Sequence, residues 1–223
     1  PTALICTSGT AAGNFHPAVL EADQARVPMV LLMADRPPEL RDSGANQTID
    51  QEKLYGDAVR YYRDLPEPEP DARKLRSLRT TVDRAVSTST GTPAGPVHLN
   101  VPFRKPLEPV DVPGDVPESF GDEQSLATEG RDGTFVTTEQ GRPTLSDAEL
   151  ARVERAVSGA DRGLVVAGPD DAFGVSKAAV AKLGEATGFP VFADPLSDAR
   201  FGTHRHRANV VGAYDGFLAP PVY

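Results

Sequence analysis

VPMVLLMA, residues 27–34, is a continuous apolar run that is long enough for a strand and too short for most helices. A strand without a polar side must be covered on both faces, which is typical of a parallel sheet in an α/β protein. Shorter runs of the same kind, ALIC at 3–6 and GPVHLNVP at 95–102, stand on either side of it. Segments with helical spacing separate these runs, so the first half is predicted to be a parallel α/β domain.

The helices of this domain are expected at 17–25, with Pro17 in the first turn, and at 71–86. The second of them has apolar residues at helical spacing, at Leu75, Leu78, Val82 and Ala85. Weaker patterns predict a short helix at 49–55 and a short strand at 58–62.

The second half begins with a change of composition. Residues 105–143 are rich in Pro, Gly, Asp and Glu, which is typical of a linker. A capping box, Ser146-Asp-Ala-Glu149, then opens a helix to about residue 157. Strands are expected at 163–168 and 190–193, and helices at 173–186 and 209–218. The predicted organisation is an α/β domain at 1–104, a linker at 105–145 and a second, partial α/β domain at 146–223.

Composition excludes several classes of function. The chain has 223 residues with 39% hydrophobic and 25% charged residues, and no apolar run approaches the ~20 residues of a membrane span. Its net charge of -9 argues against nucleic acid as a partner. The single cysteine, Cys6, lies in an apolar run and is interpreted as a structural thiol. A cytoplasmic protein is expected. The first residues, PTALIC, contain no initiator methionine and no signal-peptide pattern, so we interpret them as a strand entered partway along a longer polypeptide.

The segment TSGTAAGN, residues 7–14, lies between a predicted strand and a predicted helix. Hydroxyls, glycines and free backbone N–H groups at the carboxyl end of a strand can contact a ligand. An ordinary strand-to-helix turn, with Asn14 as a helix cap, explains the same residues. On spacing alone the turn is the better interpretation, and no nucleotide motif is present.

The most informative segment, ADRPPELRDSGANQ, occupies residues 34–47 and leaves the carboxyl end of the central strand. Two prolines after Arg36 restrict the backbone to extended conformations, so the guanidinium is held in place at low entropic cost. A fixed arginine suits a carboxylate, and Asn46 and Gln47 add neutral hydrogen-bonding groups. The alternative is a loop braced by an Asp35–Arg36 or a Glu39–Arg41 ion pair.

Other candidate residues are weaker. The basic segment 200–207 contains His204 and His206, which lack further metal ligands nearby and are expected in a solvated loop. His16 and His98 are lone histidines and are interpreted as hydrogen-bonded structural residues. The residues suggest no catalytic triad and no metal site.

Four segments in one order carry a resemblance to a known family: TSGTA from residue 7, ADRPPELR from 34, GANQTIDQ from 44 and GPVHLNVP from 95. They resemble the 2-succinyl-5-enolpyruvyl-6-hydroxy-3-cyclohexene-1-carboxylate synthase family, a transferase family of the thiamine-diphosphate-dependent enzymes. The first and last segments occur broadly among such enzymes, whereas the Asp-Arg-Pro-Pro-Glu block followed by Asn-Gln is particular to this family. The resemblance covers residues 1–105. It implies a pyrimidine-binding-type domain, truncated at its N-terminus, followed by part of a central domain.

The resemblance also implies a function and a set of site residues. In the family, 2-oxoglutarate is decarboxylated and the resulting carbanion adds to isochorismate, in menaquinone biosynthesis, with thiamine diphosphate and Mg²⁺ as cofactors. Arg36, Asn46 and Gln47 match positions that line the substrate site. The residues expected to approach the cofactor are Thr7, Ser8, Gly9, Thr10 and Asn14.

The family pattern is incomplete in this chain. The activating glutamate belongs upstream of Pro1 and the Mg²⁺-binding motif downstream of Tyr223, so we expect no catalytic or metal-binding residue here, no bound cofactor and no activity from the chain alone. A homodimer or homotetramer is expected for the longer enzyme. Two alternatives remain open: another thiamine-diphosphate carboligase, related to acetolactate synthase, or a non-catalytic α/β binding module.

Overall fold

The computed structural model describes residues 1–139, 141, 144–169, 176–206 and 208–218. The chain divides into two compact units, residues 1–140 and 141–223. Each unit contains its own parallel sheet. The predicted α/β class is therefore confirmed.

The sheet of the first unit has four strands, β1 (Thr2–Cys6), β2 (Met29–Asp35), β3 (Tyr61–Asp64) and β4 (Pro96–Pro102). Their order is β1-β2-β4-β3 and every pair is parallel. The apolar run at 27–34 thus becomes a central strand, as its uniform hydrophobicity predicts. All four carboxyl ends meet at one edge of the sheet, where loops from distant parts of the sequence come together.

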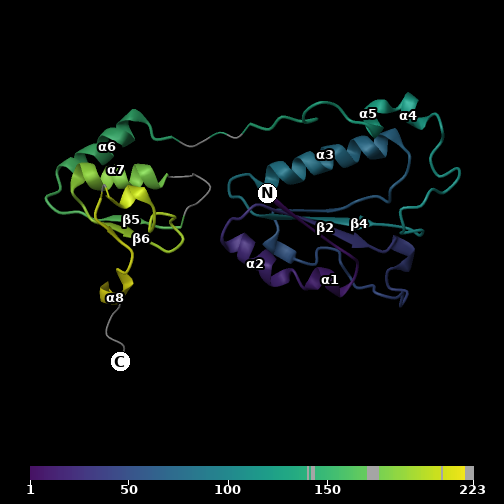
Figure 1. The fold of residues 1–223 in the computed structure, drawn as a ribbon, viewed down its shortest axis with the longest axis horizontal. Helices are drawn as coiled ribbons and strands as arrows, with labels where there is room; N and C mark the ends of the chain where they lie inside the picture. The colour runs from purple at the N-terminus through teal and green to yellow at the C-terminus, as the bar shows by residue number, and fades with distance from the viewer. Residues whose placement is uncertain (140, 142–143, 170–175, 207, 219–223) are drawn as a thin grey trace. The chain divides into compact units, whose positions relative to one another are not determined.

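Helices cover both faces of this sheet (Figure 1). Helices α1 (Thr10–Gly13) and α2 (His16–Gln24) lie on one face, and α3 (Ala72–Ser89) lies on the other. Strand residues therefore alternate between two apolar clusters. Leu31 and Met33 of β2 pack with Tyr55 on the α1–α2 side. Val97 and Leu99 of β4 pack on the α3 side, with the residues Val30, Leu65 and Ala85.

The apolar stripe predicted for α3 is only partly buried. Ala85 is completely buried, but Leu78 and Val82 remain 38% and 39% exposed. The helical spacing of apolar residues identified the helix. How deeply each side chain is buried depends instead on how far the sheet extends beneath the helix.

Two details of the first unit differ from the sequence-based expectation. The helix predicted at 49–55 is wrong: this segment consists of turns, with a 3₁₀ helix at Gly56–Ala58, and another 3₁₀ helix stands earlier at Pro38–Leu40. The strand expected at 58–62 begins instead at Tyr61. Both departures follow from tertiary hydrogen bonds of the loop, described below, which override a weak local propensity.

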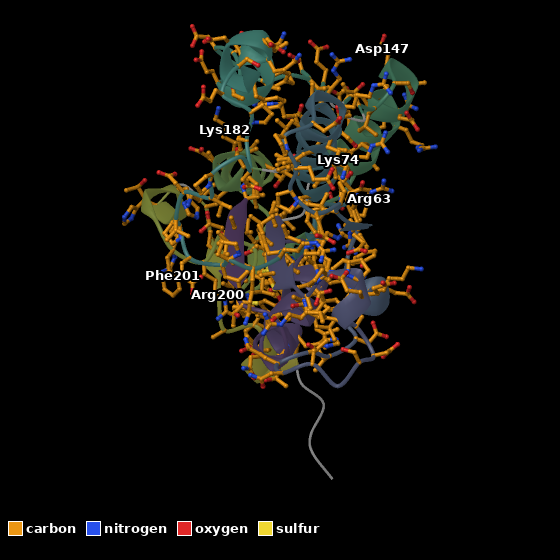
Figure 2. The ribbon with its side chains drawn as sticks, turned by 90° about the vertical axis from the view of Figure 1, so that its right-hand side faces the viewer. Arg63, Lys74, Asp147, Lys182, Arg200 and Phe201 are labelled. Atoms are coloured by element: carbon orange, nitrogen blue, oxygen red, sulfur yellow. The ribbon has the colours of Figure 1, made fainter. Side chains whose placement is uncertain are left out.

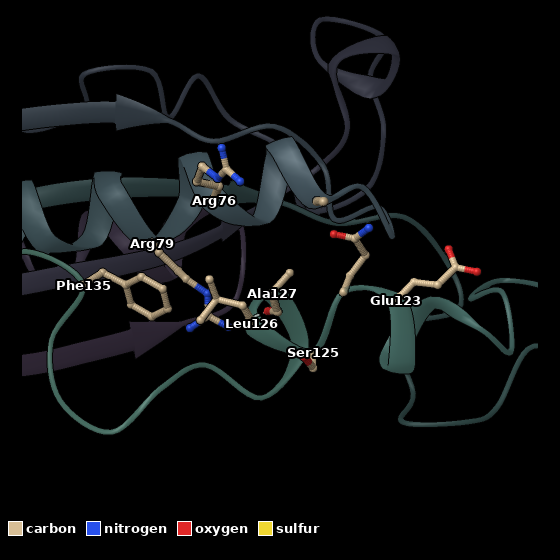
Figure 3. A pocket seen from close by; sticks show the side chains of 9 residues that line it. Arg76, Arg79, Glu123, Ser125, Leu126, Ala127 and Phe135 are labelled. Atoms are coloured by element: carbon tan, nitrogen blue, oxygen red, sulfur yellow. Dashed lines mark hydrogen bonds between the residues drawn. The ribbon is translucent and has the colours of Figure 1, made fainter.

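The segment 105–139 contacts α3 and contains two short helices, α4 (Phe120–Glu123) and α5 (Ser125–Thr128). Arg79 of α3 donates a hydrogen bond to the Ala127 carbonyl, and its guanidinium lies 4.7 Å from the centre of the Phe135 ring. Figure 3 shows these side chains around a small cavity of about 200 Å³. Cation–π and hydrogen-bond contacts thus hold a compositionally loose segment against α3.

The second unit contains a three-stranded parallel sheet of β5 (Val165–Ala167), β6 (Val191–Ala193) and β7 (Val210–Val211), in that order. Helix α7 (Lys177–Thr187) packs on β5 and β6 (Figure 1). Its C-cap is Gly188, which adopts the left-handed conformation that favours glycine. The other elements are α6 (Asp147–Ser158), a 3₁₀ helix at Thr203–His206 and α8 (Asp215–Leu218).

The helix predicted at 209–218 is wrong, because the β-branched pair Val210–Val211 joins the sheet beside β6. The short helix α8 follows it. The helix predicted at 173–186 is present from Lys177, and residues 173–175 lie outside the described residues.

The capping box at the start of α6 is present as predicted. The Ser146 hydroxyl accepts a hydrogen bond from the Glu149 N–H, and the Ser146 N–H donates to the Glu149 carboxylate at 2.9 Å. The Ser146 hydroxyl also donates to the Glu149 carboxylate at 2.7 Å, and the two hydrogen bonds that this carboxylate accepts from Ser146 hold its pKa below the usual value. The structure and the sequence agree here because the motif acts within four residues.

We expect Ser146→Ala to lower the free energy of unfolding of the second unit by about 1 kcal/mol, because the Glu149 N–H in the first turn of α6 loses its side-chain partner. Thermal unfolding followed by circular dichroism measures the change. The control is Ser158→Ala, the same substitution at the last residue of α6, where no capping role exists. Equal melting temperatures for the two variants would contradict the role of the cap.

In the described part of the chain, no helix is long and apolar enough to cross a membrane.

Candidate functional site

The candidate site lies at the carboxyl edge of the first sheet, where the loop after β1 meets the loop after β2. The two loops are joined through Gln47. Its side-chain Nε2 donates to Thr7 Oγ1 and to the Ser8 carbonyl, each at 2.9 Å. The Ser8 hydroxyl donates in return to the Gln47 carbonyl at 3.2 Å. Residues forty positions apart in sequence thus form one surface.

Close packing at this junction requires two unusual backbone conformations. Gly9 has φ 85°, and a Cβ placed on it would lie 2.9 Å from the Gln47 carbonyl oxygen. Glycine is needed there for both reasons. Gln47 itself has φ 57°, which costs a residue with a side chain about 1 kcal/mol or more. Strain of this kind is concentrated at functional sites, because the surrounding structure must hold it in place.

Arg36 lies on the same surface. Its Nη2 donates to the Asn46 carbonyl at 3.1 Å, and its backbone N–H donates to Asp35 Oδ1 at 2.8 Å. Within the described ranges, no carboxylate forms an ion pair with the Arg36 guanidinium. The guanidinium therefore keeps most of its five donors for a ligand.

Arg41 has the opposite environment. Its guanidinium contacts both oxygens of Asp64 at 3.1 Å, Asp35 Oδ2 at 3.1 Å and Glu52 Oε1 at 2.6 Å. The hydrogen bonds to Asp64 and the three negative charges raise the pKa of Arg41. Arg41 is thus neutralised by the protein itself and ties the loop after β2 to the end of β3.

The two braces considered for this loop are both wrong. Asp35 pairs with Arg41 instead of Arg36, and Glu39 pairs with Arg104 instead of Arg41. Arg41 lies further along the same loop, whereas Arg104 comes from the segment after β4. This exchange of partners is what leaves Arg36 available.

A buried polar network supports the surface from below. Gln51 is 1% exposed; its Oε1 accepts from the Gly9 N–H at 2.6 Å, and its Nε2 donates to the Ala34 carbonyl and to Asn100 Oδ1. Asn100, completely buried, donates through Nδ2 to Asp35 and Asp64 at 2.8 and 2.9 Å. The network joins both site loops to β4. A buried network in which every member has partners makes one arrangement rigid.

Sequence reasoning did not select Gln51, Asn100, Asp64 or Arg41 as parts of the site. One signal was present: Asn100 is a polar residue inside the buried strand GPVHLNV, where it must find partners. Asp64 and Glu52 carried no such signal, because their role depends on the position of Arg41 in the folded chain.

The remaining predicted site residues lie further along α1. Thr10 begins the helix and is exposed, beside the buried Ser8 and Gly9. Asn14 follows the end of α1 and is exposed, and only its backbone N–H takes part in capping. The cap that Asn14 was considered to supply to the next helix is not formed, because α2 begins after Phe15 without a side-chain cap.

His98 lies behind the site in an aromatic cluster. It is completely buried, with the Tyr55 and Tyr62 rings 5.0 and 5.1 Å away, and neither ring nitrogen has a hydrogen-bond partner in the part of the chain that the structure describes. His98 is thus structural, as expected, but not hydrogen-bonded. Burial lowers its pKa to about 4, against a smaller opposing effect of the Asp64 charge. His16 meets the Tyr55 ring edge-on at 5.5 Å.

Cys6 is half-buried and its Sγ lies 3.0 Å from Met33 Sδ. Burial raises the pKa of the thiol, so it stays protonated, as expected for a structural cysteine. No group of three or more His, Cys, Asp or Glu side chains able to hold a metal ion occurs among the described residues. In the second unit, His204 contacts the Ala199 carbonyl at 2.8 Å and His206 is exposed.

Comparison with known proteins places the chain among enzymes. No family model matches it. The curated 2-succinyl-5-enolpyruvyl-6-hydroxy-3-cyclohexene-1-carboxylate synthase of Halobacterium salinarum is 62% identical over 225 residues, covering 100% of this chain and 38% of the relative. The protein of the same name from Halorubrum lacusprofundi is 61% identical, covering 99% and 35%. That of Roseiflexus castenholzii is 44% identical, covering 98% and 37%.

The chain thus spans somewhat more than a third of the length of the curated relatives it matches. The match extends through both units, well beyond the residues that carry the motifs. Over its whole length, the chain belongs to the 2-succinyl-5-enolpyruvyl-6-hydroxy-3-cyclohexene-1-carboxylate synthase family.

Proposed function

We propose that this chain forms one wall of the active site in a thiamine-diphosphate-dependent transferase of menaquinone biosynthesis. The reaction decarboxylates 2-oxoglutarate and joins the product to isochorismate. The observation that carries the proposal is 62% identity to a named synthase along the entire chain. The geometry at the carboxyl edge of the first sheet supports it, because both substrates carry carboxylates and Arg36 has no carboxylate partner among the described residues.

In this proposal Arg36 binds a substrate carboxylate. Its one side-chain hydrogen bond, to the Asn46 carbonyl, fixes the direction of the guanidinium and leaves other donors free for bidentate pairing. Gln47 Nε2 is already used by Thr7 and Ser8, so the Gln47 side-chain oxygen is the atom left to accept a hydrogen bond from a substrate hydroxyl. Asn46, which is exposed, adds its side-chain amide beside it.

The loop after β1 fits the cofactor only in part. The exposed hydroxyls of Thr7 and Thr10 are placed to contact it, whereas Ser8 and Gly9 are occupied by Gln47 and Gln51 and act by shaping the loop. Thiamine diphosphate, when bound, supplies the electron sink for decarboxylation. We propose that residues outside this chain hold the diphosphate and Mg²⁺, so that the chain alone is inactive and binds no cofactor at the candidate site.

The proposal extends to the organisation of the longer enzyme. We propose that residues 1–104 are its pyrimidine-binding-type domain and 146–223 part of its central domain, joined by 105–145. It acts in the cytoplasm, as a homodimer or homotetramer, on small molecules and not on nucleic acid. The biosynthetic names of the relatives and the acidic charge of the chain support these assignments.

The test is Arg36→Ala in the longer polypeptide that carries this chain. We expect the apparent KM for one carboxylate substrate to rise about ten- to a hundredfold, the effect of losing one charge-assisted hydrogen-bonded pair. Steady-state kinetics with each substrate varied in turn measures it.

Arg155→Ala, at an exposed position of α6, serves as the control for losing one positive charge. Wild-type kinetic constants for Arg36→Ala with both substrates would show that Arg36 only braces the loop. Absence of the synthase reaction in the unmodified longer polypeptide would contradict the proposed function itself.

A further inference from the structure

The first unit also carries a concave surface that none of the site loops lines. It is a groove of about 420 Å³ between the edge strand β3 and helix α3. Four of the side chains that line it are arginines, Arg63 from β3 and Arg73, Arg76 and Arg84 from α3. A groove of this volume falls in the range of small-molecule sites.

These four arginines lack protein partners. None of their guanidinium groups forms a hydrogen bond or an ion pair with any residue that the structure describes. Elsewhere in the same unit Arg41, Arg60 and Arg104 each pair with at least one carboxylate. In a chain of net charge -9 carboxylates are not scarce, yet none of those that the structure describes pairs with the four guanidinium groups of this groove.

The charge of α3 strengthens this contrast. Its 18 residues include one acidic residue, Asp83, and five basic ones, Arg73, Lys74, Arg76, Arg79 and Arg84. Only Lys74 forms an ion pair, with Glu69, within the described ranges. Mutual repulsion between the groove arginines is unfavourable unless an anion sits among them.

Arg76 and Arg79 of α3 extend in different directions (Figure 3). Figure 3 shows Arg79 reaching Leu126 and Ala127 on the side of α5, whereas the guanidinium of Arg76 lies away from them. Figure 2 shows Arg63 projecting from the surface of the unit. Arg76 is thus available to the groove in a way that Arg79 is not.

Hydroxyl groups lie between the arginines. Ser77 and Thr81 of α3 line the groove, and neither hydroxyl donates to another residue in the described part of the chain. Thr80 also lines it, but donates to the Arg76 carbonyl at 3.0 Å. Guanidinium forks with interspersed hydroxyl donors match an anion that has several oxygens.

We propose that this groove binds a small anion that carries two or more phosphate or carboxylate groups. A protein partner fits less well, because protein interfaces have an apolar centre and, among the described residues that line the groove, Tyr61 is the only one with a large ring. A nucleic acid fits less well, because the acidic charge of the rest of the chain repels a long polyanion.

Isothermal calorimetry of the chain with pyrophosphate, and separately with citrate, tests the proposal at low ionic strength. We expect saturable binding of at least one of them, with a Kd of roughly tens to hundreds of micromolar, weakened by added salt. Tighter binding of pyrophosphate would identify phosphate as the preferred group, and tighter binding of citrate a carboxylate.

The variant Arg73→Gln/Arg76→Gln should bind at least about tenfold more weakly, because two charge-assisted contacts are lost. Its matched control is Arg152→Gln/Arg155→Gln, which removes two exposed arginines at the same spacing from α6. Glutamine favours helices, so both variants are expected to fold, and circular dichroism verifies it.

Three results would overturn the proposal: no saturable heat with either anion, equal weakening in the two double variants, or binding of poly-L-glutamate without binding of either small anion. The last result would identify a docking surface for an acidic polypeptide. None of these outcomes depends on the synthase reaction, so this inference and the proposed function can fail separately.

Discussion

Arg41→Ala is expected to lower the free energy of unfolding of the first unit by roughly 2–4 kcal/mol, because it leaves a buried carboxylate without its cation. Asp35 is 3% exposed, and Asp64 would lose both of its hydrogen bonds from the guanidinium. The estimate lies toward the low end for buried pairs because the Arg41 side chain itself is 18% exposed. Urea unfolding followed by tyrosine fluorescence measures the change, since the chain has no tryptophan.

The matched control is Arg104→Ala. Arg104 also pairs with two carboxylates, those of Glu39 and Glu67, but its side chain is 57% exposed. Solvent-exposed ion pairs contribute little, so this variant should unfold close to the wild-type urea concentration. Arg41→Lys keeps the positive charge but loses the planar set of guanidinium donors. Its urea midpoint should therefore lie between those of Arg41→Ala and Arg104→Ala. Equal shifts for Arg41→Ala and Arg104→Ala would show that the buried network does not stabilise the loop.

The second large effect is a dependence of stability on pH. Because the folded protein holds the pKa of His98 at about 4, below the usual 6.5, the unfolded chain binds this proton more readily. Stability from this residue is therefore fully present above pH 6.5 and is lost as the pH falls toward 4. The difference in pKa corresponds to about 3 kcal/mol. Urea unfolding at intervals between pH 7 and pH 4 measures the slope.

His98→Leu should remove that part of the slope, because leucine has similar volume and no proton to bind. The ring nitrogens have no partner among the described residues, so no hydrogen bond is lost in exchange. His206→Gln, at an exposed position, controls for the loss of one histidine and should keep the wild-type slope. If His98→Leu and the wild type lose stability in parallel between pH 6.5 and pH 4, the assignment to His98 is wrong.

Local patterns in the sequence predicted the features that act over short distances. The central strand at 27–34, the helix at 71–86 and the cap at Ser146 depend on residues within a few positions of one another, and the structure contains all three. The helices predicted at 49–55 and 209–218 failed for the converse reason. In the first, Gln51 is drawn into hydrogen bonds with Gly9 and Asn100; in the second, β7 pairs with β6.

The candidate site shows the same division. Sequence alone placed Arg36, Asn46 and Gln47 after one strand and residues 7–9 after another, and the rule that parallel strands end at one edge brings these loops together. The sequence did not predict the strand order β1-β2-β4-β3, because an apolar run does not indicate which other strands it will pair with.

What the sequence determined by itself is the α/β class, the family and the residues that could meet a ligand. Only the tertiary structure decided which arginine is free to do so. Arg36 and Arg41 stand in one motif with equal charge, and the difference between them arises from Asp64 at the end of β3 and Glu52 in the segment before β3. Electrostatic pairing depends on distance in space, so carboxylates remote in sequence neutralise Arg41 and leave Arg36 exposed to a ligand.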